Sequence, residues 1–210
     1  TGDEFLDSNH IMATAKHFSG DCGTFKGIDK GDTRISEGGL KNIHGTPYYS
    51  AFEACVQSVM ASFNSWNGVK MHGHEYLLTD VLRDQMGFNG LVVGDWNGHG
   101  EVPGCTNANC PESFNAGVDI YMAPDEWKEL YTNTVRAVKS GDISEDRLDD
   151  AVRKILTVKD RLGMLDGRKP HEYENYVGKT EHRKLAREAV SKSLVLLKNN
   201  DNLLPLDSTK

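Results

Sequence analysis

Several side chains that can bind or attack a substrate stand where short apolar runs of the sequence end. The Asp95-Trp96 pair follows the apolar run Leu91–Val93, and the Lys16-His17 pair closes an earlier run. A carboxylate placed in this way can attack an anomeric carbon and form a covalent glycosyl intermediate. Charged groups bind the hydroxyls of an uncharged sugar, while aromatic rings cover its apolar faces. The candidate set at the run ends is Lys16, His17, Phe63, Asp95, Trp96 and Met122.

These residues also have ordinary structural interpretations. Lys16 and His17 can form a polar pair at a sheet rim, with His17 as a structural histidine. Asp95 can cap the turn that follows it. Trp66 and Trp96 can pack in the core. Spacing alone does not choose between the two interpretations, so the elements that position these residues have to be considered.

The chain alternates short apolar runs with amphipathic segments. Strands are predicted at 11–18, 58–63, 90–94 and 118–122, and helices from Thr46, at 75–86, 111–116, 127–139 and 180–193, and after the N-cap Ser144. The predicted apolar face of the helix after Ser144 comprises Leu148, Val152, Ile155, Leu156 and Leu162. This alternation predicts βα units and a parallel sheet. Chemistry in βα barrels lies where the strands end, so we expect the candidate residues to lie close together.

Composition excludes several classes of function. The 210 residues include 24 Lys and Arg against 31 Asp and Glu, a net charge of −7 that argues against nucleic-acid binding. No apolar run reaches the roughly 20 residues that span a bilayer, and no dinucleotide or phosphate-binding glycine motif follows a predicted strand. The chain is shorter than the roughly 250 residues of a complete barrel. It begins at Thr1 and shows no signal peptide, so we expect a piece of a longer protein.

Cysteine and histidine spacing leaves two alternatives open. Cys105 and Cys110 bracket a short loop and can either form a disulfide or remain two free thiols, whereas Cys55 is predicted to be a buried free thiol. A disulfide would indicate an oxidising compartment. His72 and His74 form a close pair without a cysteine nearby. We therefore predict no metal site and no cofactor.

Four ordered segments resemble glycoside hydrolase family 3, in its β-glucosidase and exo-β-glucanase branch. The segments are Ala15–Gly20 (AKHFSG), Ser58–Gly68 (SVMASFNSWNG), Leu82–Trp96, with GFNGLVVGDW at its end, and Ala116–Met122 (AGVDIYM). The resemblance covers essentially the whole chain. It implies a retaining, exo-acting β-glucosidase or glucan β-glucosidase that hydrolyses terminal non-reducing β-D-glucosyl residues of a β-glucoside or β-glucan oligosaccharide.

The resemblance also implies residue roles. Asp95 would be the catalytic nucleophile, and Lys16 and His17 would hydrogen-bond hydroxyls of the terminal glucose in subsite −1. Trp96 would stack on the next sugar, and Met122 would line the pocket.

This sequence departs from the family pattern at two positions. Phe63 stands where many members have Tyr, which removes a possible hydrogen bond to the nucleophile, and Gly94 replaces a more common Ser or Thr. The family's amino-sugar branch is disfavoured because no histidine lies between Phe18 and His44.

The resemblance further implies the domain organisation. Residues 1–165 would form about the last four βα units of a (β/α)8 TIM barrel, residues 166–179 a linker, and residues 180–210 the entry to a truncated α/β sandwich domain. The missing half-barrel and second domain would be partners in the same protein, and the second domain would supply the general acid/base. Localisation would be periplasmic or secreted. The alternatives are a catalytically incomplete sugar-binding remnant and another βα-barrel enzyme.

Overall fold

The computed structural model describes residue 6, residues 10–167, residues 177–207 and residue 209. The chain divides into two compact units, residues 1–169 and 170–210. The second unit contains helix α6 (Thr180–Ser193), which has its predicted bounds, and the 3-10 turn η7 (Asn200–Asn202). Most of the predicted linker, residues 168–176, lies outside the described residues. The predicted sandwich domain stays a prediction.

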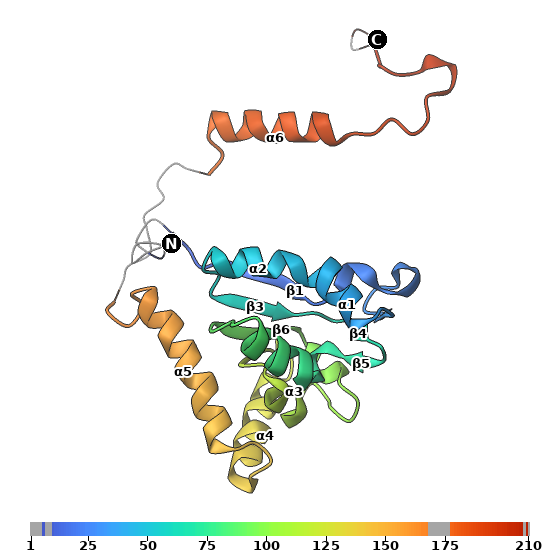
Figure 1. Ribbon diagram of the computed structural model, residues 1–210. Helices are drawn as coiled ribbons and strands as arrows, with labels where there is room; N and C mark the ends of the chain where they lie inside the picture. The colour runs from blue at the N-terminus through green and yellow to red at the C-terminus, as the bar shows by residue number, and fades with distance from the viewer. Residues whose placement is uncertain (1–5, 7–9, 168–176, 208, 210) are drawn as a thin grey trace. The chain divides into compact units, whose positions relative to one another are not determined.

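A four-stranded parallel sheet forms the centre of the first unit (Figure 1). Its strands, in spatial order, are β1 (Thr14–Phe18), β3 (Ser58–Ala61), β6 (Leu91–Trp96) and β7 (Ile120–Met122). Val59 and Val92 are wholly buried, as expected for central strands covered on both faces. The predicted α/β fold with a parallel sheet is therefore confirmed. The described strands do not close into a barrel, and the count of four barrel units stays a prediction.

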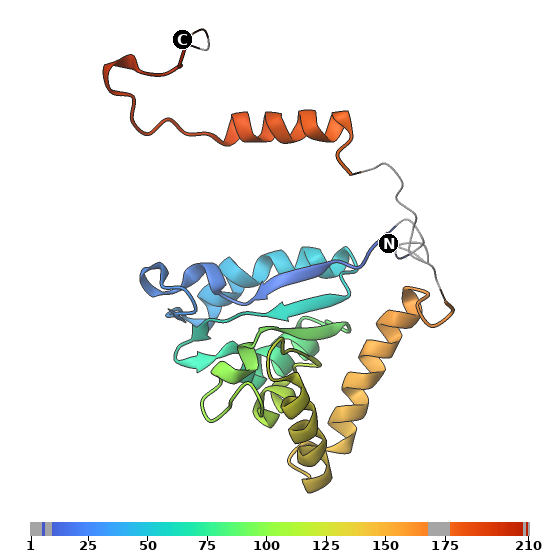
Figure 2. The same cartoon turned by 180° about the vertical axis from the view of Figure 1, so that it is seen from behind.

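The helices that follow the strands pack against the sheet. They are α1 (Glu37–Gly39), η3 (Leu40–Gly45), α2 (Thr46–Glu53), η5 (Tyr76–Gln85), α3 (Pro111–Ala116), α4 (Trp127–Ser140) and α5 (Glu145–Arg161), with η3 and η5 wound as π-helices. Seen from behind, the strands lie in front of α2 (Figure 2). Phe18 of β1 meets Tyr48 of α2 edge-on, with ring centroids 4.9 Å apart. Leu78 and Leu82 of η5 are fully buried in the same core.

The sequence analysis predicted no helix before Thr46, whereas the structure forms helical turns there in α1 and η3. Ser36 caps these turns, and its Oγ accepts the Gly39 N–H at 3.2 Å. A Cβ on Gly39 would lie 2.5 Å from the Ile35 side chain. The glycine therefore permits a close approach between helix and loop rather than ending the helix.

A second, small sheet was also missed. It consists of β2 (Asp32–Thr33), β4 (Ser65–Trp66) and β5 (Val69–Lys70). Asn67 and Gly68 have φ angles of 48° and 91°, which suit the tight turn between β4 and β5. Strands of two residues give too short a pattern for hydrophobic alternation to reveal.

Two burial predictions need correction. Val152 and Leu156 of α5 are 43% and 45% exposed, whereas Ala151 and Val158 are buried, so the buried face of the helix is rotated from the predicted one. Cys55 is a free thiol as predicted, but it is half-buried rather than buried. The N-cap prediction is confirmed, since Ser144 Oγ accepts the Arg147 N–H at 3.1 Å.

A buried carboxylate joins the sheet to two helices. The Asp119 side chain is fully buried and accepts hydrogen bonds from Arg83 of η5 at 2.6 Å and from Arg147 of α5 at 3.0 Å. It also accepts the Val92 N–H at 2.8 Å, in the middle of β6. This cluster therefore holds the strand that carries Asp95 against its covering helices.

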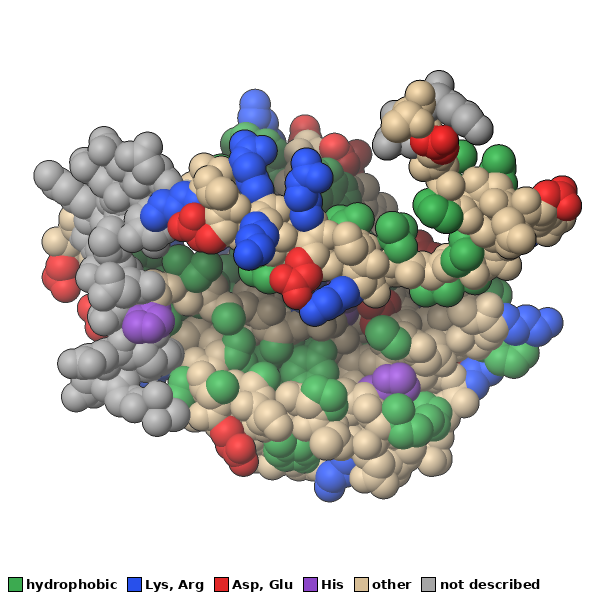
Figure 3. Space-filling model, turned by 90° about the horizontal axis from the view of Figure 1, so that it is seen from above, with side chains coloured by type: hydrophobic (Ala, Val, Ile, Leu, Met, Phe, Trp, Pro, Cys, Tyr) green, Lys and Arg blue, Asp and Glu red, His purple; other side chains and the backbone are tan. Residues whose placement is uncertain are grey.

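In the view from above, acidic and basic side chains both appear among hydrophobic ones (Figure 3). Among the described residues, no helix combines the length and apolarity required to cross a membrane.

Candidate active site

Asp95 and His17 meet at the carboxyl ends of β6 and β1, two strands of the parallel sheet that have β3 between them. Asp95 is the penultimate residue of β6, and its Oδ2 lies 3.4 Å from His17 Nε2. The other ring nitrogen, His17 Nδ1, lies 3.0 Å from Asp21 Oδ2 in the loop after β1. The side chain of Asp95 is 15% exposed, so the carboxylate is supported by protein yet accessible. Lys16 is exposed beside His17. The structure thus brings three of the predicted residues to one end of the sheet.

Backbone hydrogen bonds orient Asp95. Its Oδ1 accepts the Trp96 N–H at 2.7 Å, and its own N–H donates to Nε2 of His72 at 2.8 Å. Burial lowers the pKa of His72 from 6.5 to about 4, against the opposing effect of the Asp95 charge, so the ring is neutral near pH 7 and can accept this bond. His74, its apparent partner in the sequence, stacks instead on Trp66 with 5.5 Å between ring centroids. The two histidines therefore do not form one site.

Trp96 and Met122 end adjacent strands. They are paired in register between β6 and β7, and the Met122 carbonyl accepts the Asn97 N–H at 2.8 Å. Trp96 is 60% exposed, so its ring is free for contact with a ligand rather than packed in the core. Trp66 is the structural tryptophan, since its Nε1–H donates to the Ile35 carbonyl at 2.8 Å. Core packing, which the sequence allowed for both tryptophans, therefore applies to Trp66 and not to Trp96.

Phe63 borders a charged cluster that the sequence reasoning missed. Lys30 Nζ lies 4.1 Å from the centre of the Phe63 ring. Lys30 and Lys70 bind the two oxygens of Glu101 at 2.7 and 2.9 Å. Burial opposes ionisation of Glu101, but hydrogen bonds from the two lysines outweigh it and hold its pKa below the usual value. The hydrogen bond to Glu101 in turn raises the pKa of Lys30. No local sequence motif predicts this cluster, because Lys70 and Lys30 lie 31 and 71 residues from Glu101 in the chain.

Cys105 and Cys110 form a disulfide, which resolves the alternative that their spacing left open. The sulfur atoms and a carboxylate oxygen of Glu112 lie within 4.8 Å of one another. Because both sulfurs are bonded to each other, neither is available as the thiolate that a metal ion would require.

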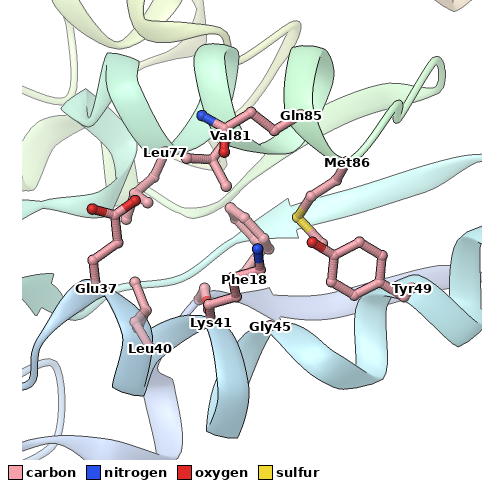
Figure 4. Close-up of a pocket in the computed structure, with 11 residues that line it drawn as sticks. Phe18, Glu37, Leu40, Lys41, Gly45, Tyr49, Leu77, Val81, Gln85 and Met86 are labelled. Carbon is pink, nitrogen blue, oxygen red and sulfur yellow. The ribbon is translucent and has the colours of Figure 1, made fainter.

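Two hollows accompany this region. A cleft of about 630 Å³ along β1 is lined by Lys16, His17, Asp21, His44 and Tyr48, among others. Burial raises the pKa of Tyr48 there. A smaller pocket of about 80 Å³ lies between η5 and the helices α1, η3 and α2 (Figure 4). Its apolar walls include Phe18, Leu40, Tyr49, Leu77, Val81 and Met86. None of the six candidate residues lines this second pocket, so it is separate from the candidate site.

Comparison with known proteins gives consistent matches. The profile of the "Glycosyl hydrolase family 3 N terminal domain" matches residues 4–158. A point mutant of an exo-1,3/1,4-β-glucanase from a Pseudoalteromonas species is 51% identical, with a TM-score of 0.87 over 98% of this chain and 34% of that chain. A point mutant of a β-glucosidase from Listeria innocua, solved in complex with laminaribiose, is 28% identical, with a TM-score of 0.79 over 97% of this chain and 29% of that one.

Two curated relatives extend the comparison. A β-xylosidase from Formosa agariphila is 38% identical over the whole of this chain and 31% of its own length. A periplasmic β-glucosidase from Salmonella typhimurium is 34% identical over 95% of this chain and 27% of its own length. The chain therefore spans about a quarter to a third of the proteins it resembles.

Proposed function

This chain belongs to glycosyl hydrolase family 3, and we propose that it carries the nucleophile and part of the −1 subsite of a retaining, exo-acting β-glucosidase or glucan β-glucosidase. The supporting observation is Asp95 itself: an accessible carboxylate at a strand end, oriented by its neighbour's N–H and facing His17. Two neighbours in the structural comparison, solved with glucose and with laminaribiose, support a glucosyl substrate.

In the first step, an Asp95 oxygen attacks C1 of the terminal glucosyl residue. The bond from C1 to the leaving-group oxygen breaks, and that oxygen takes a proton from a general acid. In the second step, water attacks C1, its proton passes to the same acid/base residue, and Asp95 departs as a carboxylate. The acid/base residue is proposed to come from the second domain, about 5–5.5 Å from Asp95 as retention requires.

Binding residues surround this centre. Lys16 and His17 donate hydrogen bonds to hydroxyls of the −1 glucose. Trp96 offers its exposed ring to the next sugar, and Met122 borders the pocket beside it. Phe63 keeps the aromatic surface of the family's Tyr without its hydroxyl.

The proposed location is the periplasm or the extracellular space. The Cys105–Cys110 disulfide favours an oxidising compartment. The Salmonella typhimurium relative, a periplasmic β-glucosidase, agrees with this location.

The test is to trap the full-length protein with a 2-deoxy-2-fluoro-β-glucoside bearing a good leaving group and to map the labelled peptide. We expect the label on Asp95, and we expect Asp95→Asn to lower kcat on the order of 10⁴-fold or more. Asp125→Asn is the matched control, because the Asp125 carboxylate binds the Asn97 side chain, at 2.8 Å, rather than Asp95. A label on another carboxylate would refute the assignment.

A second candidate is a sugar-binding remnant without activity. The observation that favours it concerns Asp21, a second carboxylate near the site. Asp21 forms an ion pair with His17, and this contact does not present it as a general acid/base. Turnover of an aryl β-glucoside by the 210-residue chain alone would exclude this candidate, because a good leaving group depends least on acid assistance.

A further inference from the structure

The N–H of Asp95 has an unusual partner for a strand residue. β6 pairs with β3 only through Val93, opposite Met60, because β3 ends at Ala61. Asp95 lies beyond the last residue of β6 that pairs with β3, and a backbone N–H that is partly buried there has to find an acceptor. His72 supplies the acceptor, since its Nε2 lies 2.8 Å from the Asp95 nitrogen. A side chain thus continues the hydrogen bonding where the sheet stops.

The imidazole is held in one place and one tautomer. His72 is 2% exposed, and a Cβ on Gly98 would lie 2.3 Å from its ring, so this turn wraps closely over the imidazole. The backbone carbonyl of Ser62, the residue just after β3, accepts a hydrogen bond from the ring. With Nε2 accepting from Asp95, the proton is on Nδ1 and faces Ser62. The ring therefore links the ends of β3 and β6.

We propose that His72 is a positioning residue for the nucleophile: its neutral Nε2 fixes the backbone at Asp95 and thereby the direction in which the carboxylate faces C1. This inference rests on the proposed function of Asp95. The N–H bond to His72 and the Trp96 N–H bond to Oδ1 together constrain both ends of the Asp95 residue. The oxygen left for attack is Oδ2, on the side of His17. A displacement of about 1 Å at a reacting atom can cost on the order of 10²-fold in rate.

Two isosteric variants separate the two ring nitrogens. His72→Gln places an amide oxygen near the position of Nε2 and retains the acceptor for Asp95. His72→Asn places an amide N–H near Nδ1 and retains the bond to Ser62 while losing the bond to Asp95. In the full-length protein we expect His72→Asn to lower kcat and the trapping rate by about 10²-fold with KM changed little, and His72→Gln to recover most of that loss.

His74→Gln is the matched control. His74 is also a buried histidine, but it stacks on Trp66 and Leu77 N–H is its hydrogen-bond partner, so its replacement is expected to leave kcat unchanged. Gly98→Ala gives an independent test that keeps the imidazole. The added methyl must displace the ring, and we expect the same loss of kcat as in His72→Asn.

The outcomes separate the two proposals. If the fluoroglucoside labels Asp95 in the wild-type protein but His72→Asn and His72→Gln lose kcat equally, the function stands and the positioning role of His72 is refuted. Unchanged kcat in Gly98→Ala refutes that role even if both His72 variants fail to fold. A label elsewhere than Asp95 overturns the nucleophile assignment and the role of His72 together.

Discussion

We expect replacement of the Asp119 carboxylate by a neutral side chain to destabilise the first unit strongly. Its buried carboxylate faces two guanidinium groups, Arg83 and Arg147, and binds the Val92 N–H. Asp119→Asn keeps the shape but leaves two positive charges facing each other in a buried site. Removal of one partner from a buried ion pair costs about 3–5 kcal/mol.

Other contacts limit the loss to that range. Arg83 still donates to the carbonyls of Gly90 and Gly117, at 3.1 and 3.3 Å. Arg147 still donates to the carbonyls of Phe114 and Val118, each at 2.9 Å. The guanidinium groups therefore keep hydrogen-bond partners and lose chiefly their neutralising charge.

Hydrogen exchange of the full-length protein measures this effect where it arises. At 1.36 kcal/mol for each factor of ten, amides of Leu91–Val93 in Asp119→Asn should exchange about 10²- to 10⁴-fold faster. Asp149→Asn, on the exposed side of α5, is the control and should change stability by less than about 0.5 kcal/mol. A loss below about 1 kcal/mol in Asp119→Asn would refute the reasoning, because it falls well short of the buried-pair range.

Three further predictions concern stability. Ser144→Ala removes the cap of α5 and should cost about 1 kcal/mol, measured by denaturant unfolding; no change would mean that solvent replaces the cap. Replacement of Cys105 and Cys110 by Ser opens a loop with a sequence separation of 5 and should lower the free energy of unfolding by about 2 kcal/mol. The Tm should then be lower than that of the oxidised wild type, and equal Tm values would contradict the prediction. The pKa of His72 is lowered from 6.5 to about 4. The unfolded chain therefore binds a proton at His72 more readily than the folded chain does. The contribution of the neutral His72 to the free energy of unfolding is complete above pH 6.5, and about 3 kcal/mol of it is lost as the pH falls to 4. His72→Gln should lack this component in urea titrations across that range, and an equal pH dependence in both proteins would disprove it.

Local patterns predicted the βα framework because burial imposes them directly. The first half of β6, Leu91–Val93, is apolar throughout, as a strand covered on both faces requires. The Ser144 cap and the bounds of α3 follow from side chains within a few residues. Asp95 and His17 could be placed together from the sequence for a geometric reason: the carboxyl ends of all strands in a parallel sheet lie at one edge, and only β3 separates β1 from β6. The 3.4 Å contact between them agrees with that expectation.

The missed features depend on contacts between distant residues. The Lys30–Glu101–Lys70 cluster has no local signature, and the helical turns at Glu37–Gly45 include Gly39, which is packed closely against the side chain of Ile35. The outward face of α5, with Val152 exposed, is set by what packs on the helix rather than by its own periodicity.

The sequence by itself therefore determined the α/β class, the order of the strands along the chain and the residue types at their ends, since these follow from periodicity and chain direction. Only the tertiary structure decided that Cys105 and Cys110 are bonded, that Trp96 and not Trp66 is free, and that His72 rather than a strand neighbour accepts the Asp95 N–H. Each of these depends on the separation of two groups in space, which close packing sets and local sequence patterns do not encode.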